Sequence, residues 1–137
     1  MDKLYSLQNG TDIRGVAYKD DKSDMEITLT REDVKNLVRG FATWIIGKDK
    51  KDHIKISIGT DSRLTGPDFR QACVEALTEI GVDVVDCGMA TTPAMFMSTI
   101  IDGYKCDGAI MFTASHMPYV YNGLKMFTSQ GCLEKSD

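Results

Sequence analysis

The sequence predicts an α/β protein, a three-layer α/β/α domain with a mostly parallel mixed sheet. Segments with the two-residue alternation of strands take turns with segments of helical periodicity, and Gly or Pro marks most of the changes. Strands separated by helices need crossover connections, which favour parallel pairing with helices on both faces of the sheet. The 137 residues are enough for one domain with its own core, so we expect a single domain, residues 1–137.

The N-terminal third is expected to hold a loop region and one helix. The first 25 residues are polar and rich in turn formers, and Asn9–Gly15 is typical of a compact loop. Thr30 suits the N-cap of a helix, because acidic side chains follow it in the first turn. Gly47 and Lys48 mark the expected end of this helix. Its apolar face is made by residues at helical spacing: Val34, Leu37, Val38, Phe41 and Ile45.

A strand, a loop and a second helix are expected next. Lys55–Ile58 alternates between polar and apolar residues as a strand does, and Gly59–Gly66 is expected to be a loop. Pro67 suits the first turn of a helix, and Gly81 is expected to end it. This helix has the clearest apolar stripe in the chain: Phe69, Ala72, Cys73, Ala76, Leu77 and Ile80.

Two further strands and a third helix complete the alternation. Val82–Asp86 is expected to be a strand, and Thr92 begins a helix that runs to about Ile101, with proline at its first position. Gly108–Phe112 is apolar throughout, which predicts a buried strand.

The segment after this buried strand is expected to fold back on it. Asn122–Gly123 is a typical turn pair, so we expect it to bring Leu124–Thr128 beside the strand as a further strand. That arrangement would carry Lys125 toward the loop that follows Phe112. The remaining residues, from Ser129, are polar and have the character of a linker.

Composition excludes several classes of function. The net charge of −4 and the absence of a basic cluster argue against general nucleic-acid binding. No apolar run approaches the roughly 20 residues that span a bilayer, and the first residues lack the apolar core of a signal peptide, so we expect a cytoplasmic protein without a membrane segment. The cysteines have no metal-ligand spacing and are expected to be reduced and mostly buried: Cys73, Cys87, Cys106 and Cys132.

The loop Thr113–Pro118 carries the most informative residues. Ser115 follows a buried strand, and α/β proteins place ligands beyond the carboxyl ends of such strands. His116 beside it is able to exchange protons near neutral pH. The loop after Lys55–Ile58 ends at the same edge of the sheet, so Arg63 and Ser115 are expected to be neighbours in space.

Each of these residues also has a purely structural interpretation. Ser115 is a common type of turn residue, and Lys125 on a strand is ordinarily a solvated charge. Asp61 and Arg63 are able to brace their loop as an internal ion pair. A serine hydrolase is disfavoured, because the G-x-S-x-G turn is missing and a histidine next to its serine is badly placed as its base.

Four motifs in order resemble the α-D-phosphohexomutase family of phosphoglucomutases and phosphomannomutases. Gly10–Gly15 resembles the N-terminal motif, and Gly59–Arg63 resembles the G-x-D-x-R loop. Thr113–Pro118 resembles the phosphoserine loop, usually T-A-S-H-N-P, and Tyr121–Lys125 resembles Y-N-G-x-K. The matches extend through most of the chain, which resembles the first of the family's four domains, domain I.

The resemblance implies that Ser115 carries a phosphoryl group, gives it to a hexose monophosphate and takes the other phosphate back from the bisphosphate. His116, Arg14 and Lys125 match positions at the transfer site. The remaining family positions, which support the loop or the phosphate, are Asp61, Arg63, Thr113 and Asn122. The resemblance also implies Mg²⁺, held by the Ser115 phosphate and by a D-G-D-x-D motif, and a hexose 1,6-bisphosphate activator.

Two departures from the family pattern bear on activity. Met117 replaces the usual asparagine, whose side chain is able to hold a turn. The D-G-D-x-D motif is absent, so the other metal ligands and the sugar-reading loops are expected in the missing C-terminal domains. We therefore expect the isolated chain to be inactive, and to self-associate through surface that those domains would cover.

The sequence leaves the substrate and one alternative function open. The T-A-S and Y-N-G elements favour phosphoglucomutase or phosphomannomutase over the aminosugar mutases. The alternative function is a non-catalytic sugar-phosphate-binding or regulatory module that kept the fold, and Met117 is the residue that favours it.

Overall fold

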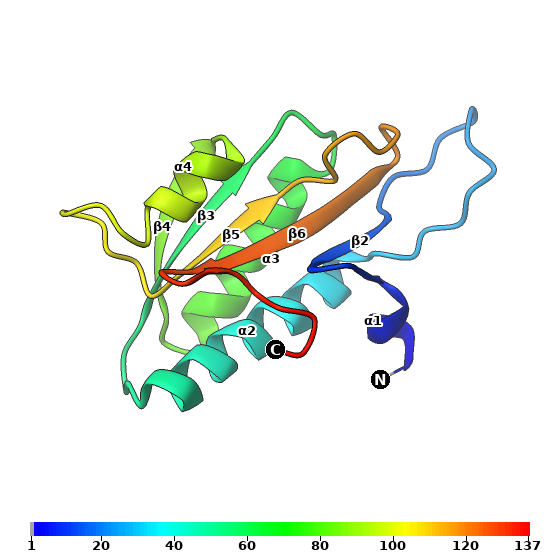
Figure 1. Cartoon of the computed structure of the whole chain (residues 1–137). Helices are drawn as coiled ribbons and strands as arrows, with labels where there is room; N and C mark the ends of the chain where they lie inside the picture. Colours follow the sequence, from blue (N-terminus) through cyan, green and yellow to red (C-terminus); the bar gives the residue numbers. More distant parts are fainter. Residues whose placement is uncertain (1) are drawn as a thin grey trace.

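The computed structural model describes residues 2–137 and shows an α/β domain built on one mixed sheet (Figure 1). The order of the strands is β1-β2-β6-β5-β3-β4, and β7 pairs with β6. The helices are α1 Asp2–Ser6, α2 Arg31–Asp49, α3 Gly66–Glu79 and α4 Thr92–Met97. The strands are β1 Gln8–Asn9, β2 Asp12–Val16, β3 Lys55–Thr60, β4 Asp83–Met89, β5 Gly108–Phe112, β6 Tyr121–Thr128 and β7 Gly131–Cys132.

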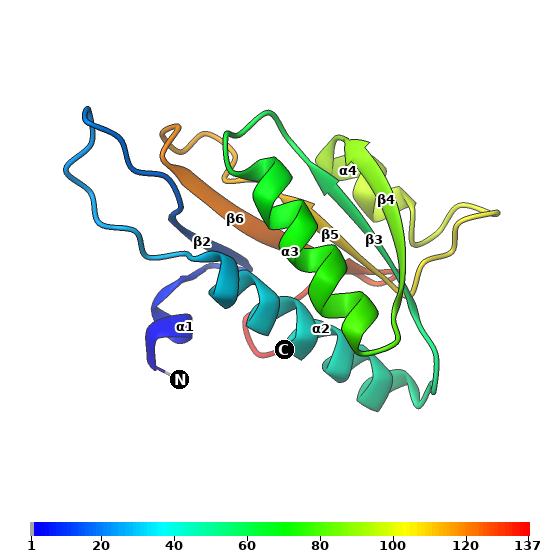
Figure 2. The same ribbon diagram turned by 180° about the vertical axis from the view of Figure 1, so that it is seen from behind.

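Helices cover both faces of the sheet, which confirms the predicted fold class. Helices α2 and α3 pack side by side on one face (Figure 2), and α4 lies on the other (Figure 1). Strand β3 is parallel to both β4 and β5, whereas β6 is antiparallel to β5, β2 and β7. The parallel pairs are limited to the β5-β3-β4 side, where the crossover helices connect the strands. The sheet is therefore mixed, but it is not mostly parallel as the sequence had predicted, because β6 runs antiparallel to each of its neighbours.

The core is divided unequally between the two faces. On the face of α4, a smaller cluster consists of Met95, Ala109, Met111 and Phe127. On the face of α2 and α3, large apolar side chains are almost fully buried, among them Val34, Val38, Phe41, Ile45, Ile56, Ile58, Phe69, Leu77, Ile110 and Phe112. Within residues 2–137, every helix is too short or too polar to span a lipid bilayer.

Helix α2 begins as predicted but ends later. Thr30 and Asp33 form a capping box, in which each side chain accepts a hydrogen bond from the other residue's backbone N–H. The helix continues through Gly47 to Asp49, and Lys50 then takes a left-handed conformation at φ 51°. A glycine is tolerated inside a helix at a modest cost, so Gly47 did not end it.

The other expected helices need one correction. Helix α3 has Pro67 in its first turn and is followed by Gly81 at φ 78°, as predicted. Helix α4 ends at Met97, short of Ile101, because the chain continues in tight turns. These turns bury Ser98 and Thr99 but leave Ile100 42% and Ile101 46% exposed, so the two isoleucines gain no burial that would favour a longer helix.

Two segments expected to be loops or turns are strands. Residues Asp12–Val16, placed in a compact loop by their composition, form β2 and pair with β6. Asn122 and Gly123 lie within β6 and do not form a turn, because the chain reverses earlier, in the loop after Phe112. Strand pairing supplies the backbone hydrogen bonds in both cases, which local propensity does not register.

Gly123 lies where β6 passes closest to its neighbours. It is opposite Arg14 of β2, and its carbonyl accepts a hydrogen bond of 3.0 Å from Thr113 N. A Cβ atom at this position would lie 2.2 Å from the Ile13 carbonyl oxygen and 2.9 Å from the Thr113 carbonyl oxygen. These neighbours are backbone atoms and cannot rotate away, so only glycine fits between them.

Substitution of Gly123 by alanine should destabilise the domain by about 2 kcal/mol or more, because the new methyl group forces β2 and β6 apart. Urea denaturation measures the effect. Gly47→Ala is the matched control: no atom lies within 4 Å of a Cβ atom there. That variant should gain about 0.5–1 kcal/mol, since alanine is the better helix former. A Gly123→Ala domain that is as stable as the wild type, or more stable, would contradict the packing argument.

Candidate active site

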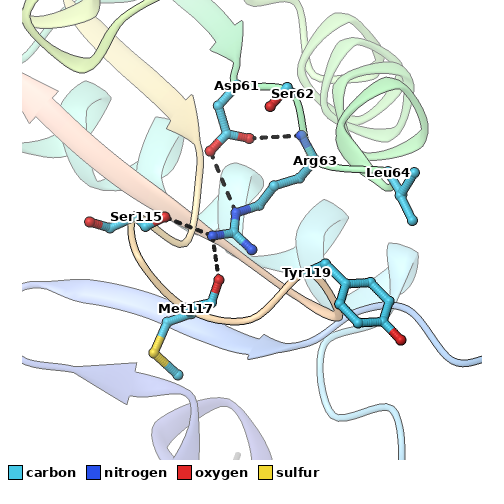
Figure 3. Close-up of a pocket in the computed structure, with 7 residues that line it drawn as sticks. All are labelled: Asp61, Ser62, Arg63, Leu64, Ser115, Met117 and Tyr119. Atoms are coloured by element: carbon cyan, nitrogen blue, oxygen red, sulfur yellow. Dashed lines mark hydrogen bonds and ion pairs between the residues drawn. The ribbon is translucent and has the colours of Figure 1, made fainter. Parts of the chain in front are cut away.

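Ser115 lies at the exposed tip of the loop between β5 and β6. Its backbone is in the left-handed region at φ 55°, which is uncommon for a residue other than glycine. Its N–H donates to Thr113 Oγ1 at 3.0 Å, and its hydroxyl oxygen lies 3.5 Å from His116 Nδ1. Figure 3 shows the hydroxyl directed away from the loop interior. The serine is therefore accessible to a reactant outside this domain.

The Arg63 side chain binds backbone carbonyl groups of the Ser115 loop (Figure 3). The guanidinium donates four hydrogen bonds to carbonyl oxygens of this loop, at 2.8–2.9 Å, and its side chain is only 10% exposed. The accepting residues are Ser115, Met117, Pro118 and Tyr121. Arg63 and Ser115 are thus neighbours, as their positions at the ends of β3 and β5 predicted. Because its Nη donors are committed to carbonyl groups, Arg63 supports the loop.

Asp61 connects Arg63 to the base of the same loop. One carboxylate oxygen accepts from Arg63 N at 3.1 Å, and the other accepts from Thr113 Oγ1 at 2.6 Å. The second oxygen also lies 3.5 Å from Arg63 Nε. Because Thr113 Oγ1 in turn accepts from Ser115 N, a continuous chain of hydrogen bonds runs from Asp61 to the serine.

Met117 closes the loop through its backbone alone. Its N–H donates to Ala114 O at 3.0 Å, and its carbonyl accepts from Arg63. Neither contact needs a side-chain amide, so the loop keeps a defined geometry with methionine at this position. The Met117 side chain lines an open depression of about 500 Å³, with Asp61, Ser62, Arg63, Leu64, Ser115 and Tyr119.

Arg14 and Lys125 form a second group of charges. Arg14 Nη2 and Lys125 Nζ bond to the same oxygen of Asp12, at 2.8 and 2.5 Å. No hydrogen bond within residues 2–137 joins either cation to Ser115. Sequence reasoning did not identify Asp12, although its position two residues before Arg14 on a strand places both on one face.

Two further residues have roles that the sequence did not reveal. Asn122, expected in a turn, is buried in β6 and donates to Thr65 Oγ1 at 2.9 Å, which ties β6 to the start of α3. Tyr119 donates to the Asp20 carboxylate at 3.2 Å. Desolvation and the Asp20 charge raise the pKa of Tyr119, so its hydroxyl keeps its proton as a donor. These contacts join segments that are distant in the sequence, so no local sequence pattern predicts them.

The side chains of residues 2–137 do not complete a metal site. No group of three metal-ligating side chains occurs within residues 2–137. Asp61 is the carboxylate in the depression, and both of its oxygens are already engaged, by Arg63 N and Thr113 Oγ1.

The fold and the loop define an α/β domain with its candidate reactive group beyond the carboxyl ends of parallel strands, the usual ligand position in such sheets. Residues 6–137 match the protein family described as phosphoglucomutase/phosphomannomutase, alpha/beta/alpha domain I. The chain belongs to this family.

Individual relatives agree with this assignment. A phosphoglucosamine mutase from Caldicellulosiruptor bescii is 39% identical over 132 residues, which are 96% of this chain and 26% of that protein. One from Nautilia profundicola is 46% identical over 77 residues, which are 56% of this chain and 17% of that protein. A solved structure, a phosphoglucomutase/phosphomannomutase family protein from Burkholderia thailandensis, has a TM-score of 0.77 at 27% identity and covers 99% of this chain and 28% of that chain.

The chain spans about a quarter of the length of the curated relatives it matches, 26% in the case of the Caldicellulosiruptor bescii protein. The activity of those whole proteins therefore depends on much sequence that this chain does not contain.

Arg63→Lys should release the Ser115 loop, because one ammonium group cannot reach four carbonyl oxygens in a fixed plane. We expect a stability loss of about 3 kcal/mol and faster amide hydrogen exchange in residues 115–121. Arg39→Lys is the control, since Arg39 pairs with Glu79 across a solvent-exposed surface. The control should change stability by less than about 0.5 kcal/mol. Equal amide exchange rates for residues 115–121 in the two variants would refute the conclusion that Arg63 holds the loop.

Proposed function

We propose that this chain is the phosphoserine-bearing domain I of a phosphohexomutase and that Ser115 is the phosphoryl carrier. The observation that carries the proposal is the accessible Ser115 hydroxyl, at a strained loop tip held by Arg63 and Asp61, in a chain that belongs to this family. Phosphoryl transfer depends mainly on positioning and charge neutralisation, and a rigidly held serine meets the first need.

The reaction consists of two transfers. In the first, the bond between phosphorus and Ser115 Oγ breaks as a sugar hydroxyl oxygen attacks; the sugar proton passes to a base, and Ser115 Oγ takes up a proton. In the second, Ser115 Oγ gives up its proton and attacks the other phosphate of the bisphosphate, and the departing sugar oxygen regains a proton. His116 Nδ1 lies 3.5 Å from the serine oxygen and is able to give and take the serine proton. Arg14 and Lys125 supply positive charge for the phosphoryl oxygens.

Mg²⁺ and a hexose 1,6-bisphosphate activator belong to the same proposal. The metal would neutralise charge on the transferring phosphoryl group, and the Ser115 phosphate would be its ligand from this chain. The bisphosphate would restore the phosphoserine whenever it is lost.

The names of the relatives revise the expected substrate. The T-A-S and Y-N-G elements favoured glucose or mannose phosphates, whereas the relatives from Caldicellulosiruptor bescii and Alkaliphilus oremlandii are named phosphoglucosamine mutases, at 39% and 32% identity. We therefore propose a hexosamine phosphate as the sugar, with glucose and mannose phosphates as comparison substrates.

A non-catalytic sugar-phosphate-binding or regulatory module remains the second candidate. It rested on Met117, because methionine cannot supply the side-chain hydrogen bonds of asparagine. The backbone contacts of Met117 weaken that argument, since the loop closes without them. A cytoplasmic location and self-association of the isolated domain stay predictions. The exposed apolar side chains of Met89, Ile101 and Tyr104 are available for contacts between copies of the domain.

The isolated 137-residue chain should show little or no mutase turnover. The depression beside Ser115 is open, and the sequence contains no D-G-D-x-D motif. A coupled assay with glucosamine 6-phosphate, glucose 1,6-bisphosphate and Mg²⁺ measures this. Turnover at the usual enzyme range of about 1 s⁻¹ or more would contradict the expectation that the isolated chain is inactive.

A hybrid enzyme tests the nucleophile itself. Residues 6–137 replace the matching domain of the Caldicellulosiruptor bescii relative, and turnover and intact mass are measured after treatment with the bisphosphate. The hybrid should gain one phosphoryl group and turn over. Ser115→Ala should abolish the gain and lower kcat by about a thousandfold or more.

Ser62→Ala is the matched control, because Ser62 is an exposed serine that lines the same depression. It should leave phosphorylation and turnover within about twofold of the parent hybrid. Phosphorylation that persists in the Ser115→Ala hybrid would reject Ser115 as the carrier. A folded hybrid that never gains a phosphoryl group would favour the non-catalytic module.

A further inference from the structure

The buried carboxylate of Asp12 joins the two cations that the proposed reaction needs. Strands β2 and β6 are antiparallel, with Ile13 opposite Leu124, so Asp12 and Lys125 meet across the pair. Arg14, two residues along β2, projects on the same side of the sheet. Asp12 is 5% exposed, and its Oδ2 atom accepts from both Arg14 and Lys125.

This cluster lies one strand away from the base of the Ser115 loop. Gly123 stands between them: the position of its missing Cβ is 3.2 Å from Arg14 Cα and 2.9 Å from the Thr113 carbonyl oxygen. Thr113 in turn receives the Ser115 N–H on its hydroxyl. The absence of a side chain at Gly123 thus brings the backbone that carries Arg14 against the backbone that leads to the serine.

Among residues 2–137, Asp12 is the carboxylate that pairs with both cations, and it offsets one of their two positive charges. Arg14 and Lys125 have side chains that are 14% and 21% exposed, so water screens their mutual repulsion poorly. A single carboxylate oxygen draws both cations to one point. Asp12 Oδ1 and Arg14 Nε are buried without a hydrogen-bond partner among the described residues, so both groups keep unused bonding capacity.

We propose that Asp12 is a positioning residue, which holds Arg14 and Lys125 together on β2 and β6 so that both present their charge to the phosphoryl group on Ser115. The proposal rests on the proposed function, since it assigns the two cations to that transfer. Asp12 does not touch the phosphoryl group. It acts through the cations, and it offsets part of their charge when no phosphate is present.

Chemical reactivity of Lys125 tests the contact on the 137-residue chain itself. Limited acylation with acetic anhydride, followed by peptide mass spectrometry, gives a rate for each lysine. In Asp12→Asn the rate at Lys125 should rise about tenfold or more, the factor that corresponds to losing one charged hydrogen bond. Asp12→Glu should bring it back toward the wild-type rate.

Lys35 is the internal control, because it is similarly shielded, with 18% side-chain exposure, and pairs with Glu75. Its rate should stay unchanged in both variants. Glu26→Gln is the control variant: it removes the exposed partner of Lys19 and should change that lysine's rate by less than about twofold. An unchanged rate at Lys125, or an equal rise at Lys35, would overturn the positioning role, since the second result means general loosening of the fold.

The hybrid enzyme supplies the functional readout. Asp12→Asn should lower kcat about a hundredfold and leave KM within about twofold, because misplaced cations impair transfer more than binding. Asp12→Glu should recover part of the loss. If the parent hybrid, with Asp12 unchanged, is inactive, the proposed function is rejected. The acylation rates then test the contact between Asp12 and Lys125 independently. An active hybrid that is unaffected by Asp12→Asn defeats the inference alone.

Discussion

The candidate site depends on the hydrogen bonds between the Arg63 guanidinium and the backbone carbonyl groups of the Ser115 loop. Loops seldom have a hydrophobic core of their own, so their shape must come from hydrogen bonds or from packing against the scaffold. Here one planar group, itself anchored at the end of β3, binds four carbonyl oxygens of the loop that follows β5. Turning those carbonyls inward leaves Ser115 at the outside in a left-handed conformation. Such a conformation is retained only where the surroundings impose it, as Arg63, Asp61 and Thr113 do here.

The two faces of the sheet carry apolar cores of different size. On the face of α2 and α3, burial of apolar side chains supplies the greater part of the core, and ion pairs such as Arg39–Glu79 link the two helices at the surface. Lys35 and Arg31 both bind Glu75 and lower the pKa of its carboxyl to about 2, so this link stays charged in mildly acidic solution. The opposite face has the smaller apolar cluster with α4.

The seam between β2 and β6 is where packing and proposed function meet. The close approach at Gly123 is a steric requirement of the sheet, and the same approach sets Arg14 beside the base of the serine loop. Asp12 then decides where the two cations of this seam point. Gly123, which backbone packing requires, and Asp12, which pairs with both cations, therefore both influence the position of Arg14.

How much the sequence could predict follows from the range of the forces involved. The helix starts at Thr30 and Pro67, the buried strand Gly108–Phe112 and the stripe of α3 from Phe69 to Leu77 were predicted, because caps and periodicity are local properties. Ile80, expected in the same stripe, follows the end of α3 and is 42% exposed. The proximity of Arg63 and Ser115 was also predictable, since it follows from the chain order of parallel strands.

Tertiary structure alone decided the rest. The strand character of Asp12–Val16 comes from pairing with β6, more than a hundred residues along the chain, and nothing in its own composition requires it. The binding of Arg63 to backbone carbonyls, and of Arg14 and Lys125 to Asp12, likewise depends on contacts between distant segments. The residues themselves indicated a reactive serine and its cations. The fold determined which of those cations holds the loop and which two share a buried carboxylate, because hydrogen-bond partners are chosen by proximity in space.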